Sequence, residues 1–259
     1  MPAWNAAQYL RFGDERTRPC RDLTARVEVV SPARVIDLGC GPGNSTAVLR
    51  ERWRAAEITG LDSSEEMLAK ARADGPAALW VQGDIARWAE QEGEPFDIVF
   101  SNAALQWVPD HATLFPNLLR RVAPGGALAV QLPAYSDQPG QRLIRELARS
   151  AKWQGRFTRE PVDWRAESVE FYYDTLAPRA GRLELWETEY VHVVGGTHAV
   201  VDWYRATGLR PFLQALPTEK DQAQFVGEYH AALEPHYRPQ RDGKVLFPFR
   251  RLFVLAYAA

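Results

Sequence analysis

The stretch that decides the fold is VIDLGCGPGNST, residues 35–46. It opens with a mostly apolar segment, residues 35–38, of the kind found in a buried strand. Three glycines follow within five positions, at Gly39, Gly41 and Gly43, and after them comes a run of small polar residues that can cap a helix. Glycine accepts positive φ angles and lets another group approach the backbone closely. The pattern therefore predicts a strand, a turn and a helix that hold a ligand against the main chain.

The spacing of these glycines narrows the kind of ligand. A phosphate-binding P-loop ends in Gly-Lys followed by Ser or Thr, and this stretch has no such ending. A dinucleotide fingerprint would place its third glycine at position 44, whereas the sequence has Asn44 there and the glycine at Gly43. What remains is a compact turn that suits a ligand without a pyrophosphate.

The composition of the chain excludes several classes of function. The chain has 259 residues, of which 46% are hydrophobic and 25% charged, which predicts a globular α/β protein. A net charge of −2 gives no overall attraction to nucleic acid or to an acidic membrane. The two cysteines provide neither a disulfide framework nor a metal cluster. Neither a membrane-length apolar run nor a signal-peptide pattern is found, so we expect a cytoplasmic protein.

Alternating strand and helix patterns run through the first half of the chain. We expect strands over residues 34–40, 56–62, 77–85, 96–105 and 127–133, and helices over 22–30, 63–74 and 111–123. Such alternation indicates a doubly wound, mainly parallel sheet with helices on both faces. No internal repeat or low-complexity tract interrupts it.

The second half changes character after about residue 134. We expect helices over residues 141–153, 197–216 and 219–237, and strands over 182–194 and 244–258. These helices are interpreted as a cap over the strand ends. The whole chain is then a single domain over residues 1–259, with an N-terminal helical segment over 1–30, a ligand-binding core over 31–133, cap helices within roughly 134–240, and C-terminal strands that complete the sheet.

Polar residues stand at the ends of the expected strands. Asp62 ends the second strand, where an acid can accept hydrogen bonds from both hydroxyls of a ribose, and it can also cap the next helix. Asp84 ends the third strand, within reach of the exocyclic amino group of a purine, and Ile85 can flank the ring. Asn102 ends the fourth strand. Because the carboxyl ends of parallel strands share one edge of the sheet, where such folds bind ligands, these residues predict a single site.

A family resemblance accounts for all of these features. The motifs VIDLGCGPGNST, GLDSSEEML, QGDI, FDIVFSNAALQWV and RVAPGGALAVQLP resemble, in this order, the motifs of class I S-adenosylmethionine-dependent methyltransferases. The longer segments 4–27, 102–133 and 201–213 resemble the trans-aconitate methyltransferase family, while residues 151–163 carry no motif that we can assign. The resemblance implies a Rossmann-like, seven-stranded sheet with a helical cap.

The resemblance also implies the cofactor, S-adenosylmethionine, with S-adenosylhomocysteine as the product. The backbone of the glycine turn approaches its amino-acid part, an acid attracts its α-ammonium group, and the later strand ends hold the ribose and adenine. The implied cofactor-binding residues are Tyr9, Asp37, Gly39, Gly41, Asp62, Ser63, Met67, Asp84, Ile85 and Asn102. Tyr9, or Trp4, closes over the cofactor from the N-terminal segment; packing of the first helix is the alternative role for both.

The methyl acceptor implied by the resemblance is a carboxylate of a small polycarboxylic acid, with trans-aconitate as the expected substrate and a monomethyl ester as the product. A carboxylate is already ionised at neutral pH, so no catalytic base is expected, and His111 is interpreted as a residue at the start of a helix. Guanidinium and hydroxyl groups suit carboxylates. The candidate substrate-binding residues are Gln106, Trp107, Tyr135, Tyr172, Tyr173, Tyr204, Arg205 and Arg210.

Two other functions remain open at this point. One is a methyltransferase for a different small or carrier-bound acceptor, such as a phenol, which would need a base. The other is a module that binds the cofactor without turnover. For the main prediction we expect no metal, no nucleic acid and no membrane, and no protein partner is evident; a carrier-bound acceptor would instead need a basic surface patch for its carrier protein.

Overall fold

The computed structural model describes residues 13–134, 138–159, 161 and 166–259. Seven strands in this part form one sheet in the order β3-β2-β1-β4-β5-β7-β6. Pairing is parallel from β3 through β5, and β7 runs antiparallel to both β5 and β6. The strands are β1 (Arg34–Leu38), β2 (Glu57–Asp62), β3 (Leu79–Gln82), β4 (Phe96–Asn102), β5 (Val122–Pro133), β6 (Ala180–Val194) and β7 (Val245–Ala258). The predicted mainly parallel, doubly wound sheet is confirmed.

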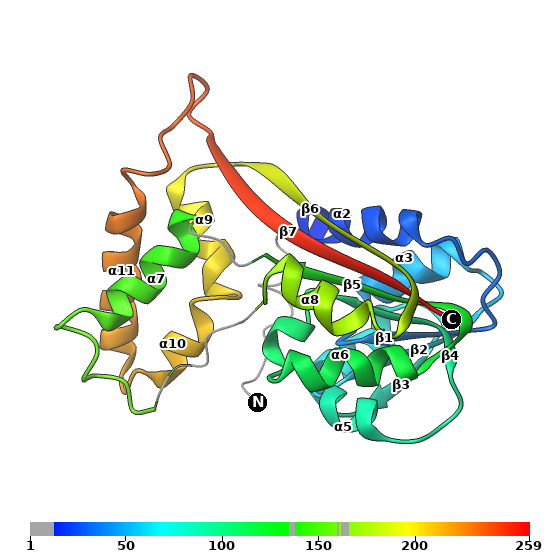
Figure 1. The fold of residues 1–259 in the computed structure, drawn as a ribbon. Helices are drawn as coiled ribbons and strands as arrows, with labels where there is room; N and C mark the ends of the chain where they lie inside the picture. Colours follow the sequence, from blue (N-terminus) through cyan, green and yellow to red (C-terminus); the bar gives the residue numbers. More distant parts are fainter. Residues whose placement is uncertain (1–12, 135–137, 160, 162–165) are drawn as a thin grey trace.

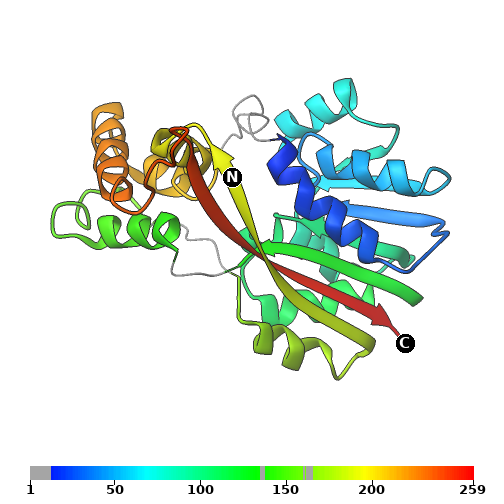
Figure 2. The same ribbon diagram turned by 90° about the horizontal axis from the view of Figure 1, so that it is seen from above.

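Helices cover both faces of this sheet. On one face, α2 (Gly13–Arg26) and α3 (Asn44–Arg52) bury Cys20, Leu23 and Leu49 against the strands. The other face is covered by α5 (Ile85–Glu90), α6 (His111–Arg120) and α8 (Val169–Leu176), and α8 lies beside α6 (Figure 1). Seen from above, the sheet separates the two layers (Figure 2). A sixth helix of the core, α4 (Glu65–Asp74), follows β2.

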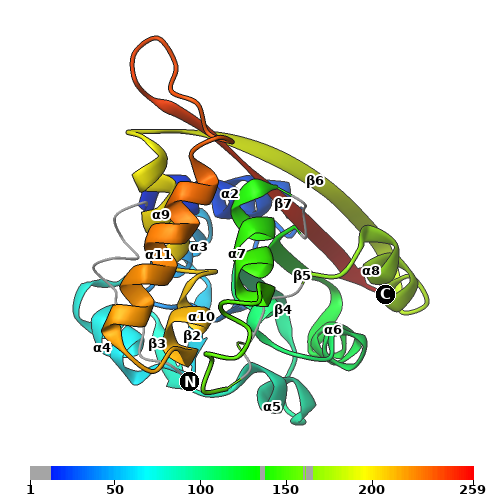
Figure 3. The ribbon, with the colours of Figure 1, turned by 90° about the vertical axis from the view of Figure 1, so that its left-hand side faces the viewer.

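The remaining helices form a cap with a hydrophobic core of its own. The cap consists of α7 (Pro139–Arg149), α9 (Thr197–Arg205), α10 (Arg210–Ala215) and α11 (Glu219–Leu233). Its core includes Trp153, Trp203, Phe225 and Tyr229, and it packs on Phe247 near the start of β7. The long β6 and β7 therefore belong to the sheet at one end and to the cap at the other (Figures 1 and 3).

Several element boundaries differ from those predicted. Helix α2 begins at Gly13 and ends at Arg26, whereas the apolar pattern had indicated residues 22–30; Pro19 lies within the helix. The single helix expected over 197–216 is two helices, α9 and α10, because α9 ends before Gly208 and α10 begins with Arg210 and a proline. Helices α5 and α8 were not predicted; both are short.

Candidate active site

The glycine turn after β1 has the backbone conformation that only glycine adopts easily. Gly39, Gly41 and Gly43 have φ angles of 71°, 54° and 92°. The N–H of Gly39 donates to the carbonyl of Leu61 at 2.7 Å, which holds the turn against the end of β2. A Cβ atom at Gly39 would lie 2.2 Å from the Cβ of Ala104, whereas one at Gly41 would meet nothing within 4 Å. Gly39 is therefore needed for packing, and the backbone of Gly41 is open to a ligand.

Asp62 connects this turn to the helix that follows β2. Its Oδ2 accepts a hydrogen bond from Gly41 N at 2.9 Å, and its Oδ1 accepts one from Ser64 N at 2.8 Å. Burial raises the pKa of this carboxyl, and the backbone donors act against that shift. A carboxylate has about four acceptor positions, so each oxygen can still accept a ligand hydroxyl. This geometry fits a ribose diol. Asp62 is not itself the N-cap of the next helix, because Ser64 is the N-cap of α4.

Asp37 lies fully buried beneath the glycine turn. Ser45 Oγ and Thr46 Oγ1 both donate to its Oδ2 at 2.6 Å. Its Oδ1 is buried and has no hydrogen-bond partner within the described part of the chain. Burial raises the pKa of Asp37 to about 6, and the two hydroxyl donors limit the rise. A buried carboxylate with one unsatisfied oxygen favours a positively charged group nearby. Asp37 therefore fits the α-ammonium group of the cofactor.

A cavity of about 380 Å³ opens at the carboxyl ends of β1 to β4. That volume lies in the range of small-molecule sites. Eight of the predicted cofactor-binding residues line it: Gly39, Gly41, Asp62, Ser63, Met67, Asp84, Ile85 and Asn102. Asp37 lies outside this lining, and Tyr9 and Trp4 lie outside the described residues. The structure therefore brings the polar strand ends together at one cavity, as predicted.

Asp84 also has a local structural role, whereas Asn102 has an unsatisfied oxygen. Asp84 Oδ1 accepts a hydrogen bond from Arg87 N at 3.0 Å and caps α5, which begins at Ile85. Its second oxygen can accept from a ligand amino group. Asn102 Oδ1 is buried and without a hydrogen-bond partner in the described regions. Together with the unsatisfied oxygen of Asp37 and the acceptors of Asp62, these atoms fit the amino, hydroxyl and ammonium groups of S-adenosylmethionine.

The predicted substrate-binding residues divide into two groups. Trp107 and Arg210 line the cavity. Burial lowers the pKa of Arg210, and the carboxylate of Glu66 opposes this; its guanidinium stays charged at neutral pH. The others do not line it: Gln106 donates to the carbonyl of Ala103, Tyr204 is buried in the core of the cap, and Arg205 is exposed at the end of α9. Tyr135 lies outside the described residues.

Tyr172 and Tyr173 are also placed away from the cavity, on α8. Tyr173 is 55% exposed, and Tyr172 is fully buried against α6, so the structure brings neither of these predicted substrate-binding residues to the cavity. The hydroxyl of Tyr172 lies 2.8 Å from Nδ1 of His111, and Nε2 of His111 lies 2.9 Å from the carbonyl of Leu105. His111 is the first residue of α6, as predicted, and both of its ring nitrogens have partners. The aromatic residues 171–173 had been interpreted as part of the cap. They lie instead on α8, where the helical period places Tyr172 on the buried face.

Sequence reasoning missed part of the cavity wall. The additional lining residues are Pro42, Ala103, Ala104, Val108, Arg159, Pro211 and Gln214. Arg159 belongs to the segment that matched no family pattern. The buried Trp153 anchors that segment by donating from Nε1 to Glu228 at 2.8 Å, and Thr158 donates from its N–H and its Oγ1 to the carbonyl of Ala215 at 2.7 and 2.9 Å. Trp153 and Phe157, four residues apart, were the available signal that this segment packs on the cap.

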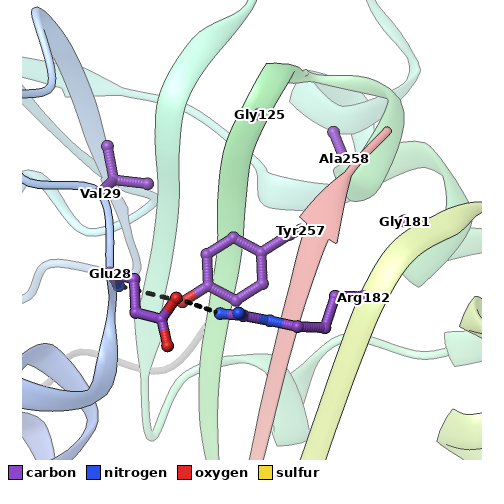
Figure 4. Close-up of a pocket in the computed structure, with 7 residues that line it drawn as sticks. All are labelled: Glu28, Val29, Gly125, Gly181, Arg182, Tyr257 and Ala258. Carbon is purple, nitrogen blue, oxygen red and sulfur yellow. Dashed lines mark hydrogen bonds and ion pairs between the residues drawn. The ribbon is translucent and has the colours of Figure 1, made fainter.

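A second pocket, of about 400 Å³, lies at the opposite edge of the sheet (Figure 4). There Glu28 N donates to Tyr257 Oη at 3.0 Å, and the Glu28 carboxylate pairs with Arg182 at 2.7 Å. The guanidinium of Arg182 also lies 4.1 Å from the centre of the Tyr257 ring. These polar groups satisfy one another, and none of the predicted site residues lines this pocket.

Two further searches concern only the described residues. Among them no cluster of three or more histidine, cysteine or acidic side chains could hold a metal ion. None of their helices combines the length and the apolar character needed to cross a membrane.

Comparison with known proteins agrees with the site. Residues 35–126 match a family model described as a methyltransferase domain. The chain is 48% identical over 256 residues to trans-aconitate 2-methyltransferase of Azoarcus sp. (strain BH72), and the match covers 99% of both chains. It is also 48% identical over 257 residues to the protein of the same name from Methylobacterium nodulans, covering 99% of this chain and 98% of that one. The YcgJ protein from Bacillus subtilis shares the fold, with a TM-score of 0.61 at 14% identity over 93% of this chain and 98% of that one.

Identity at this level along nearly the whole length confirms the predicted family, the methyltransferase activity and S-adenosylmethionine as the cofactor. The same long match includes residues 151–163, which the motifs alone had left unassigned. The chain belongs to the trans-aconitate 2-methyltransferase family of class I S-adenosylmethionine-dependent methyltransferases.

Proposed function

We propose that this chain methylates one carboxylate of trans-aconitate, or of a closely similar small tricarboxylate, to give a monomethyl ester. One observation carries the proposal: two arginines, Arg159 and Arg210, line the same cavity as the predicted cofactor-binding residues. Guanidinium groups bind carboxylates in a bidentate manner, so a polycarboxylate can be held while one carboxylate faces the cofactor. The names of the 48% identical relatives support this acceptor.

The proposed roles follow from where each residue stands. Asp62 accepts the ribose hydroxyls, Asp84 and Ile85 meet the adenine, and Asp37 and Asn102 face the amino-acid end. When bound, S-adenosylmethionine supplies an electrophilic methyl group. The acceptor carboxylate is ionised at neutral pH and gives up no proton, so residues of this chain need only orient it and keep water away. The apolar side chains of Trp107, Val108 and Pro211 line the same cavity and suit that task.

Gln214 is a further candidate for the substrate side of the cavity. It lies one residue before Ala215, whose carbonyl holds Thr158, so the side chains of Gln214 and Arg159 come from adjoining segments. Its Oε1 is buried and has no hydrogen-bond partner within the described residues. We include it with Arg159 and Arg210 in the proposed substrate-binding set.

The division of the chain is part of the proposal. Residues 31–133 supply the cofactor-binding core, and the cap within residues 134–240 supplies the substrate wall. A cytoplasmic location, the absence of a protein partner and the roles of Tyr9 and Tyr135 stay predictions of the sequence.

The test is methyl transfer from isotope-labelled S-adenosylmethionine to a panel of small carboxylic acids, with mass spectrometry of the products. We expect a monomethyl ester of the tricarboxylate. Arg210→Ala should lower kcat/KM for it by roughly 10- to 100-fold, because a charge-assisted hydrogen bond contributes about 1.5–3 kcal/mol. Arg205→Ala is the matched control and should change kcat/KM less than twofold, since this arginine is exposed outside the cavity.

Two outcomes would contradict the proposal. One is a wild-type protein that methylates a phenol or amine of the panel but no carboxylate. The other is an Arg210→Ala variant that loses activity equally on the tricarboxylate and on an analogue lacking one remote carboxylate.

A further inference from the structure

The turn between β4 and α6, residues 103–110, supplies four residues of the cavity wall: Ala103, Ala104, Trp107 and Val108. It contains a short 3₁₀ segment, Leu105–Trp107, and no longer regular element. Because this wall lies beside Asn102 and the glycine turn, the position of these few residues sets the space next to the cofactor.

This turn holds backbone strain at both ends. Ala103 and Asp110 have φ angles of 56° and 54°, and they are the non-glycine residues with positive φ in the described part of the chain. Such conformations cost on the order of 1–3 kcal/mol each and persist only where the surroundings hold them. At one end Ala103 N donates to the carbonyl of Gln131 at 2.9 Å, and at the other Asp110 caps α6. The middle of the turn needs a separate support.

That support comes from His111 and α8. The carbonyl of Leu105 accepts hydrogen bonds from Val108 N and from Nε2 of His111, both at 2.9 Å. Nδ1 of His111 lies 2.8 Å from Tyr172 Oη, which itself accepts from Glu167 N at 3.1 Å. The residues Glu167, Tyr172, His111 and Leu105 thus form one chain of hydrogen bonds, which we call the His111 relay.

The proton positions in this relay are fixed by its ends. A backbone carbonyl can only accept, so the hydrogen of the imidazole must be on Nε2. The N–H of Glu167 donates to the Tyr172 oxygen, and the hydroxyl hydrogen of Tyr172 then has Nδ1 as its acceptor if that nitrogen carries no proton. The arrangement in which every hydrogen of the relay has an acceptor is therefore the one with a neutral His111. Protonation of Nδ1 would remove the acceptor for Tyr172.

Packing makes the relay rigid. His111 is 4% exposed and Tyr172 is fully buried. Phe115 completes a group of three rings, with centroids 5.2 Å from His111 and 4.6 Å from Tyr172. Buried and fully satisfied polar networks hold a single arrangement, because any alternative leaves a donor or an acceptor unpaired.

We propose that His111 is a positioning residue: through the relay it fixes the strained turn, and thereby places Trp107 and Val108 against the reacting carboxylate. The role in catalysis rests on the proposed function. The relay contacts neither cofactor nor substrate, and His111 does not act as a base. Residues at this distance from the chemistry affect the rate because small displacements of the wall reduce the fraction of correctly aligned substrate.

The test uses variants that remove the polar groups of the relay one side chain at a time. Tyr172→Phe deletes one oxygen, and Tyr173→Phe, on the exposed face of the same helix, is the matched control. We expect Tyr172→Phe to lower kcat by about tenfold. Its affinity for S-adenosylhomocysteine should change less than threefold, because Asp62, Asp84 and Gly41 are untouched. Tyr173→Phe should behave as the wild type.

Substitutions of His111 separate positioning from plain packing. His111→Phe removes both hydrogen bonds, whereas His111→Gln keeps an N–H that can donate to the Leu105 carbonyl and should retain more of kcat. The double variant of His111→Phe and Tyr172→Phe should lose no more than His111→Phe alone, since the relay acts as one unit. Independent packing contributions would instead multiply, and that result would overturn the proposal.

Hydrogen exchange gives a readout that needs no activity. In Tyr172→Phe the amides of Trp107 and Val108, which close the 3₁₀ turn, should exchange at least tenfold faster than in Tyr173→Phe. In the wild type, ¹⁵N NMR should show His111 as the neutral Nε2–H form. Unchanged exchange together with unchanged kcat would refute the relay. If the wild type methylates no carboxylate while exchange responds as expected, the proposed function fails and the relay stands.

Discussion

The cofactor affinity of this methyltransferase should depend on pH through Asp37. Burial raises the pKa of this carboxyl to about 6 in the ligand-free protein. Its unsatisfied Oδ1 lies beneath the glycine turn, which we propose receives the amino-acid end of the cofactor. The α-ammonium group favours the ionised carboxylate, so binding lowers the pKa of Asp37 and releases a proton below about pH 6. Affinity should therefore rise as the pH rises through 6 and then level off.

The magnitude follows from that pKa. At pH 5 only about one molecule in eleven has Asp37 ionised, and at pH 7 about ten in eleven have it ionised. The dissociation constant of S-adenosylhomocysteine should thus be about tenfold larger at pH 5 than at pH 7, which corresponds to about 1.4 kcal/mol.

Titration calorimetry in buffers from pH 5 to 8 measures the dissociation constant of S-adenosylhomocysteine. The proton release is obtained from the dependence of the binding enthalpy on the ionisation enthalpy of the buffer. Asp37→Asn is the control: it should bind weakly and lose the part of the pH dependence that belongs to Asp37, while any part due to Asp62 persists. Thr46→Val removes one of the two hydroxyl donors that lower the pKa, so it should move the midpoint to higher pH. An affinity in the wild type that is flat with pH, or a pH dependence that is undiminished in Asp37→Asn, would refute the assignment.

Three further outcomes are expected. In the ligand-free protein the raised pKa of Asp37 favours folding at low pH, and this contribution is lost as the pH rises through about 6. The free energy of unfolding of Asp37→Asn should therefore rise relative to that of the wild type between pH 4 and 7, by up to about 3 kcal/mol. Urea unfolding measures this difference. Asp62→Ala should weaken S-adenosylhomocysteine binding by about 1–3 kcal/mol in calorimetry without loss of cooperative unfolding, and an unchanged dissociation constant would exclude the ribose contact. Gly39→Ala should lower the melting temperature well below that of Gly41→Ala. Both variants take on backbone strain, but only the Cβ added at position 39 would lie 2.2 Å from Ala104 Cβ. Equal decreases in melting temperature would show that the turn moves freely.

Local patterns were enough to predict which strand-end residues line the cavity. Asp62 and Asn102 are the last residues of β2 and β4, and Asp84 lies two residues after β3. Parallel strands bring their carboxyl ends to one edge, so chain position alone placed these residues together. The same reasoning did not show which residues of the cap helices face the core of the cap and which face solvent. Tyr204 and Arg205 are adjacent in the chain, yet one is in the core of the cap and the other is in solvent. A rotation of about 100° per residue along a helix is sufficient to separate neighbours in this way.

The sequence by itself determined the sheet and the glycine turn, because these depend on strand order and on residues that act through their backbone or at a strand end. The resemblance of its motifs to known ones gave the cofactor and the family. Only the tertiary structure decided which cap residues line the cavity. Arg159 reaches the cavity because Trp153 and Thr158 attach its segment to α11 and α10, partners that are more than 50 residues away in the chain. His111 and Tyr172, 61 residues apart, became a relay only once α8 packed on α6. Contacts of this kind depend on how separate helices pack, and no local period in the sequence encodes them.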